Sequence, residues 1–150
     1  MKLLSRLFGK KAEERGTVQR WSLSPWEARM RAGRMVRSAA GLGVELDYSP
    51  ESLAKVDMLI DKERETGVGP TKEMVYVLVS LGAYAGEVMV RHLGGEWHRA
   101  AAAPLQDPLV MVVGDKYAVN VVSMVLRRFL AGEPHSVARM FEEAKKLRSP

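Results

Sequence analysis

Six polar residues recur at helical spacing inside an otherwise apolar stretch, residues 71–97. They are Glu73, Tyr76, Ser80, Tyr84, Glu87 and Arg91. At about 100° per residue they fall on one narrow stripe of a helix. Phenol, hydroxyl, carboxylate and guanidinium groups beside apolar surface can orient a polar ligand. The candidate ligand-binding residues are therefore Tyr76, Ser80, Tyr84, Glu87 and Arg91, together with Trp97 and His98 just after the helix.

Two other interpretations of this stripe stay open. Glu87 and Arg91 stand four residues apart, which is the spacing of an ordinary helix salt bridge. Alternatively, Glu87 with His98 or Tyr84 would serve a hydrolase-like enzyme, provided that these side chains converge. The GxSxG, Walker P-loop and GxGxxG motifs are all absent, and no paired nucleophile is visible. The sequence therefore favours a non-catalytic site, and we expect no catalytic residues.

The sequence contains few of the cysteine and histidine residues that bind metal ions. The chain has no cysteine and three histidines, His92, His98 and His135. His92, Glu96 and His98 are close in sequence, but a Gly-Gly turn separates the first from the other two, and no HExxH motif is present. We therefore expect neither a metal nor a cofactor. The lack of cysteine also excludes disulfides and thiolate catalysis.

A second candidate site is basic. Arg29, Arg31, Arg34 and Arg37 fan over one predicted helix, and four arginines on one helix can bind phosphates. The alternative is a solvated helix face. Residues 1–43 hold ten Lys/Arg against three Glu, giving +7, whereas residues 44–150 hold thirteen Lys/Arg against fifteen Asp/Glu, giving −2. Such a charge asymmetry favours an anionic partner for the N-terminal part, either nucleic acid or a membrane surface.

The N-terminus is the least globular part of the sequence. We expect residues 1–20 to form a basic, flexible arm and residues 21–150 to form one domain. Within the arm, residues 1–15 can form a short amphipathic helix that binds a membrane weakly and reversibly, or simply a frayed terminus. We expect no transmembrane helix, because the uncharged run at residues 74–86 is shorter than the ~20 apolar residues that a span needs. No secretory signal is recognisable.

Local signals place the elements that position these residues. Ser24-Pro25 with Glu27 predicts a capped helix over 25–40, with Trp26, Met30, Met35, Val36 and Ala39 toward the core. A second cap-then-proline start predicts a helix over 50–65. Thr71 begins the central helix, 72–93, and the glycine pair at 94–95 ends it. Two further helices follow, one capped by Asp115 or Asn120 and ended by Gly132, and one over about 137–147.

The predicted fold class is α+β: a helix-rich single domain around a buried central helix, with a small antiparallel sheet. The sheet is expected from residues 96–101 and 109–113, and residues 44–47 are a candidate third strand. Gly82 and Gly86 lie on one face of the central helix, opposite the polar stripe. Because a mid-helix glycine costs up to ~1 kcal/mol relative to alanine, two of them predict the close approach of another backbone.

Three segments carry a family resemblance: residues 46–53 (LDYSPESL), 81–87 (LGAYAGE) and 94–97 (GGEW). With residues 108–113 and Asn120, they resemble a family of small uncharacterised bacterial proteins. The resemblance covers roughly residues 44–143. It implies a bacterial cytosolic α+β domain and carries no activity with it.

These observations lead to three functional hypotheses. The first is a non-catalytic interaction or ligand-binding module whose polar stripe receives a protein or a small polar ligand. The second is the hydrolase-like enzyme. The third is an adaptor that binds a membrane surface or nucleic acid through its first 43 residues. We expect a cytoplasmic location, either free or peripheral to the inner face of the membrane, and the sequence leaves a homodimer open.

Overall fold

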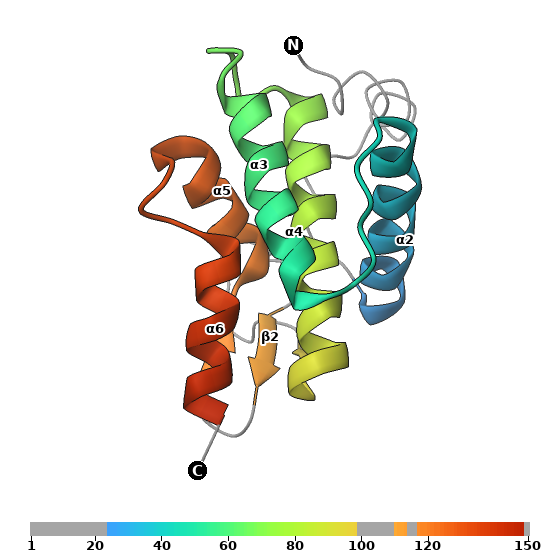
Figure 1. Ribbon diagram of the computed structural model, residues 1–150, viewed down its shortest axis with the longest axis vertical. Coiled ribbons are helices and arrows are strands. Elements are labelled where there is room, and N and C mark those ends of the chain that lie inside the picture. Colours follow the sequence, from blue (N-terminus) through green and yellow to red (C-terminus); the bar gives the residue numbers. More distant parts are fainter. Residues whose placement is uncertain (1–23, 99–109, 114–116, 149–150) are drawn as a thin grey trace.

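Helices make up most of the protein. The computed structural model describes residues 24–98, 110–113 and 117–148 (Figure 1). Within them the helices are α2 (Pro25–Gly41), α3 (Leu53–Arg64), α4 (Lys72–Leu93), α5 (Val121–Ala131) and α6 (Val137–Arg148), with a 3₁₀ turn η1 (Pro50–Ser52) before α3. The predicted helix-rich architecture is thus confirmed. The predicted arm, residues 1–20, lies outside the described residues.

The sheet is a minor element. Its three strands, β1 (Glu96–His98), β2 (Val110–Val113) and β3 (Tyr117–Val119), are three or four residues long and pair antiparallel in the order β1-β2-β3. Trp97 pairs with Met111, and Met111 with Val119. The protein is therefore mostly helical, and the term α+β overstates the sheet. Residues 99–101 and 109, which the prediction included in strands, lie outside the described residues.

The predicted third strand at residues 44–47 was wrong. This segment belongs to no helix and pairs with none of the strands in the described residues. It follows the end of α2, where Gly43 adopts a positive φ of 79°, and it buries Leu46 against the helices. Alternation of apolar and polar residues does not suffice for a strand, because a strand also needs a neighbour with free backbone groups. Here the alternation reflects one buried side chain on a connecting segment.

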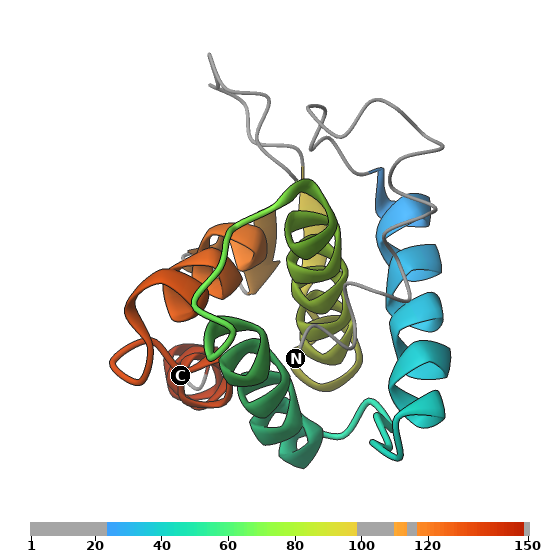
Figure 2. The same cartoon turned by 90° about the horizontal axis from the view of Figure 1, so that it is seen from above.

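Helix α4 is the interior rod that its composition predicts. Thr71 caps it by accepting a hydrogen bond from the Met74 amide, and Gly94 ends it in the left-handed conformation, with φ 67°. Of its 22 residues, 16 are buried. Seen from above, α4 lies between α2 on one side and α3 and α5 on the other (Figure 2). An all-round apolar helix is stable in water only with such neighbours.

By length and composition alone, α4 is long and apolar enough to cross a membrane, although the uncharged run at residues 74–86 predicted no such helix. It is the one such helix among the described residues. However, 83% of its most apolar window is buried inside the protein. Packing against the other helices therefore accounts for its apolar composition without a membrane.

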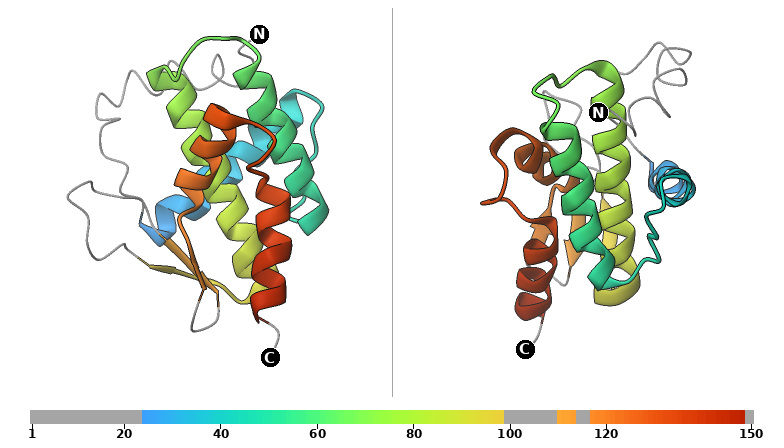
Figure 3. Two further views of the ribbon diagram at one scale, coloured as in Figure 1. Left: turned by 90° about the vertical axis from the view of Figure 1, so that its left-hand side faces the viewer. Right: turned by 45° about the horizontal axis from the view of Figure 1, so that its top comes forward.

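Helix α2 faces the core through small residues. Ser24 and Glu27 form the predicted capping box. Its buried face is Ala28, Ala32, Met35 and Ala39. The prediction that Trp26 faces the core was wrong, because its side chain is 62% exposed. Alanines on the inner face let α2 approach α4 closely, and the two helices cross obliquely (Figure 3).

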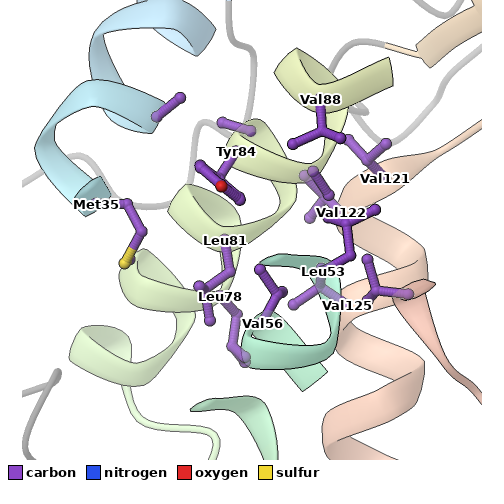
Figure 4. Close-up of a cluster of buried hydrophobic side chains, with 14 of the residues drawn as sticks. Met35, Leu53, Val56, Leu78, Leu81, Tyr84, Val88, Val121, Val122 and Val125 are labelled. Carbon is purple, nitrogen blue, oxygen red and sulfur yellow. The ribbon is translucent and has the colours of Figure 1, made fainter. Parts of the chain in front are cut away.

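The core forms where α2, α3 and α5 meet α4. Met35 of α2, Leu53 and Val56 of α3 and Val122 of α5 converge on Leu78, Leu81 and Tyr84 of α4 (Figure 4). Tyr84 is the largest fully buried side chain among the described residues. A residue that the sequence assigns to the polar stripe therefore lies at the centre of the molecule.

Candidate functional site

The stripe faces inward along most of its length. Tyr76, Ser80, Tyr84 and Glu87 are all buried, and only Arg91 at the C-terminal end is exposed. Because α4 is one unbroken helix over these residues, their helical spacing places them along one edge of it. Whether that edge receives a ligand depends on what its polar atoms already bind.

Tyr84 binds the connection between α2 and α3. Its hydroxyl accepts a hydrogen bond from the Tyr48 amide at 2.8 Å and lies 2.6 Å from the Ser52 hydroxyl. Burial raises the pKa of Tyr84 above its ordinary value, whereas its hydrogen bonds with Ser52 and Tyr48 lower it. This phenol hydroxyl is thus engaged in fixing residues 48–52 on α4.

Glu87 binds the strand that follows α4. Its Oε2 accepts a hydrogen bond from the Trp97 indole Nε1 at 2.9 Å. Gly86 makes this contact possible, because a Cβ at that position would overlap the Trp97 ring. Gly82, by contrast, faces the backbone of Val121, whose carbonyl oxygen would lie 3.2 Å from an added Cβ. The predicted close backbone is therefore confirmed at Gly82, while at Gly86 the neighbour is an indole ring.

The hydroxyl of Ser80 forms its hydrogen bond within the helix. Ser80 Oγ donates to the Tyr76 carbonyl oxygen at 3.0 Å. In the described residues no buried side-chain nitrogen or oxygen lacks a hydrogen-bond partner. The interior part of the stripe therefore has no vacant polar atom that awaits a ligand, and it serves to hold other elements on α4.

Arg91 has a different role from the predicted salt bridge. Its guanidinium carbon lies 3.6 Å from the centroid of the Tyr48 ring, over the ring face. No ion pair joins it to Glu87, although both residues are described, because that carboxylate is directed to Trp97. Burial raises the pKa of Tyr48, and the nearby positive charge of Arg91 counteracts this. The arginine thus keeps an uncompensated charge at the protein surface.

Two of the four arginines of α2 contact Tyr76, a residue of the stripe. The Arg31 guanidinium lies 4.6 Å over the Tyr76 ring, and Arg34 Nη1 donates to the Tyr76 hydroxyl at 3.5 Å. Arg37 is exposed and lies close enough to Tyr48 to lower the pKa of its phenol. Arg29 is exposed on the other flank of α2. We call the resulting surface, formed by Arg31, Arg34, Arg37, Tyr48, Tyr76 and Arg91, the arginine–tyrosine face.

The histidine and glutamate residues near the end of α4 do not form a metal site. His92 Nε2 lies 2.8 Å from the Tyr48 carbonyl oxygen, and His98 pairs with Glu96 at 3.5 Å on the exposed side of β1. The described residues contain no cluster of three potential metal ligands. Glu87 contacts neither His98 nor Tyr84 through a hydrogen bond, so the hydrolase-like alternative gains no support from the geometry.

Sequence reasoning missed a buried charge cluster on the other side of α4. Arg128 of α5 donates from Nε and Nη2 to the two carboxylate oxygens of Asp61, at 2.9 and 2.7 Å. Asp57 accepts from the Ser136 hydroxyl and from the Val137 amide, both at 2.8 Å. One signal was present in the sequence: Arg128 stands between apolar residues on the inward face of α5. The cluster ties α3, α5 and α6 together.

Comparisons with protein-family models, with curated proteins and with solved structures give no match for this chain. Membership of the family that the chain resembles therefore stays a prediction. The residues of its three motifs do meet in space: Tyr48 and Ser52 contact Tyr84, and Trp97 contacts Glu87.

Proposed function

We propose that this protein is a non-catalytic interaction module that binds an anionic surface through its arginine–tyrosine face. The observation that carries the proposal is Arg91, exposed and stacked on Tyr48 while the carboxylate one turn before it binds Trp97. A guanidinium held over the face of an aromatic ring loses little side-chain freedom when it binds an anion.

Further support comes from the arginines of α2. Arg34 and Arg37 form no ion pair with any described carboxylate, and Arg34 is steadied by its hydrogen bond to Tyr76. Cations left without carboxylate partners raise the local potential and attract anions. The N-terminal concentration of charge, +7 over residues 1–43, has the same sign.

Among anionic partners, a membrane surface is favoured by Trp26. Its side chain is 62% exposed in the first turn of α2, and Arg37 stands eleven residues later, three helical turns along the same line. Tryptophan beside arginine is typical of helices that lie at the lipid headgroup level. Single-stranded nucleic acid stacks its bases on free aromatic faces, but the rings of Tyr48 and Tyr76 are covered by arginines. A duplex, which needs no such stacking, is distinguished from a membrane by the binding test. A location peripheral to the inner face of the membrane follows from this proposal.

The test compares two double variants of equal charge. Arg37→Gln/Arg91→Gln removes two cations from the arginine–tyrosine face, and Lys62→Gln/Lys146→Gln removes two exposed cations from α3 and α6. Co-sedimentation is measured with phosphatidylcholine vesicles with and without phosphatidylserine over a salt series. Each cation near an anionic membrane contributes ~1 kcal/mol. The first double variant should therefore bind vesicles with phosphatidylserine about 30-fold more weakly, and the binding of the second should change little.

Three results would contradict the proposal. Equal losses in both double variants would show that only net charge matters. Binding that does not respond to salt or to phosphatidylserine would exclude an electrostatic surface. Tighter binding to a duplex or single-stranded nucleic acid than to vesicles, unchanged by Trp26→Ala, would assign the face to nucleic acid.

A further inference from the structure

A pocket opens between α5 and α6. These two helices lie on the side of the molecule away from α2 (Figures 2 and 3). Its volume is about 220 Å³, and it is open to solvent. Its apolar walls are Met124 of α5, Met140 of α6 and Pro134 of the connection between them. This pocket is separate from the arginine–tyrosine face and from the polar stripe of α4.

The charged groups of the pocket are mainly positive. Arg127 lines it from α5 and Arg139 from α6, and His135 of the connection between these helices also belongs to the lining. Neither guanidinium forms a hydrogen bond or ion pair with a described residue. Glu143 is the one carboxylate in the lining, and it forms no ion pair with Arg139 although it stands one turn later on α6. Two cations without ion pairs thus border a small cavity whose lining is part polar and part apolar.

Backbone groups at the start of α6 cannot supply this attraction. The amides of Val137 and Ala138 donate to Asp57, and the Arg139 amide donates to the Ser136 hydroxyl. The carboxylate of Asp57 accepts from Ser136, which belongs to the lining, and its negative charge is offset by Arg128, 3.9 Å away. An anion in this pocket would therefore be held by the side chains of Arg127 and Arg139.

We propose that this pocket binds a small organic anion, with its apolar group between Met124 and Met140 and its carboxylate or phosphate on Arg127 and Arg139. The site goes beyond the proposed surface-binding function and does not depend on it. A volume of 220 Å³ lies below the ~300–1,000 Å³ of pockets for drug-sized ligands, so a single ring or a short chain fits. Methionine side chains adapt readily to the shape of such a group.

Methionine methyl NMR tests the site in the full-length protein. Phenyl phosphate is titrated to about 10 mM into protein labelled with ¹³C at the methionine methyls, a range that detects millimolar dissociation constants. The Met124 and Met140 signals should shift saturably. The buried Met35, Met74 and Met89 should not shift, and Met30, a partly exposed methionine of α2 outside the pocket lining, should not shift either. Phenol and inorganic phosphate serve as probes that lack one of the two parts.

Charge variants decide the mode of binding. Arg127→Gln and Arg139→Gln should each weaken phenyl phosphate binding about tenfold, because each loses a charge-assisted hydrogen bond. Glu143→Gln should strengthen it by removing the only repelling carboxylate of the lining. The matched control, Lys62→Gln on α3, should leave it unchanged. The proposal is overturned if no saturable shift occurs, if phenol binds as tightly as phenyl phosphate, or if both arginine variants bind as the original protein does.

Discussion

Tyr84 shows how a polar residue can belong to a core. Its ring is fully buried, while its hydroxyl satisfies the Tyr48 amide and contacts the Ser52 hydroxyl. A buried polar group without such partners would cost ~1–3 kcal/mol. The phenol therefore combines apolar packing against α2 and α3 with a fixed position for the chain that connects them.

Tyr84→Phe should lower the free energy of unfolding by about 1–3 kcal/mol, because it leaves the Tyr48 amide without its acceptor. Urea denaturation followed by circular dichroism measures this loss. Tyr48→Phe is the matched control, since the Tyr48 hydroxyl forms no hydrogen bond with a described residue. If both variants lose the same stability, the hydrogen bonds of Tyr84 are not the cause.

The same phenol should make stability sensitive to alkaline pH. Burial raises the pKa of Tyr84, and also that of Tyr48, above the ordinary value of 10.0. The folded state then holds the phenolic proton more tightly than the unfolded chain, so this contribution is complete below pH 10 and falls as pH rises through the folded-state pKa. Denaturation at a series of pH values should show a shallower alkaline decline for Tyr84→Phe than for the original protein.

Single residues were the easiest part of the stripe to identify and the hardest to interpret. Helical spacing alone places Tyr84 and Glu87 on one edge of α4. The partners of Tyr84, Tyr48 and Ser52, are 36 and 32 residues away from it in sequence, and no local pattern predicts such contacts. Arg91 was expected to pair with Glu87, but the Glu87 carboxylate accepts a hydrogen bond from the indole of Trp97 instead. The types of the residues suggested a site; the tertiary contacts assign most of them to internal support.

At the scale of elements, local chemistry predicted the ends of helices well. Ser24 with Glu27, Thr71 and Gly94 act within one helical turn, so they can be identified without knowing the fold. Strands were harder to predict. β3 was missed and residues 44–47 were assigned wrongly, because a three-residue strand depends on a partner rather than on its own composition.

Gly86 fixes how β1 lies against α4. Gly86→Ala should lower the free energy of unfolding by about 1–3 kcal/mol, because the new methyl group displaces the Trp97 ring and breaks its bond to Glu87. In a Trp97→Leu background the same substitution should be neutral or stabilising by up to ~1 kcal/mol, since alanine is the better helix former. A double-mutant cycle from urea denaturation measures this change of sign.

The comparison position for this cycle is Gly82. A Cβ there would press on the backbone of Val121 and Val122, which cannot rotate away as a side chain can. Gly82→Ala should therefore remain destabilising when Trp97 is leucine. If Gly86→Ala is equally costly in both backgrounds, the indole does not occupy the space in front of it.

At the scale of the whole molecule, α4 separates two regions of opposite organisation. On one side, Arg34, Arg37 and Arg91 form no ion pair with a described carboxylate. On the other, Asp57, Asp61 and Arg128 neutralise one another and hold the C-terminal helices. Sequence composition revealed the first region through its charge asymmetry. It could not reveal the second, because residues of α3 and α5 that lie 67 positions apart form the pair.

The Asp57 contacts determine whether α6 unfolds with the rest of the molecule. Asp57 is 8% exposed, and its carboxylate accepts hydrogen bonds from Ser136 and from two amides at the start of α6, Val137 and Ala138. Asp57→Ala should therefore lower the free energy of local unfolding of α6 by about 2–4 kcal/mol, because those amides and Arg128 lose a buried partner. Hydrogen exchange read by mass spectrometry should show faster exchange in α6 while α4 keeps its protection. Glu142→Ala, at an exposed position of α6 itself, is the control and should change neither. Equal loss of protection in α4 and α6 would mean instead that α6 belongs to the same cooperative unit as the central helix, and that the Asp57 contacts stabilise the whole molecule rather than the attachment of its last element.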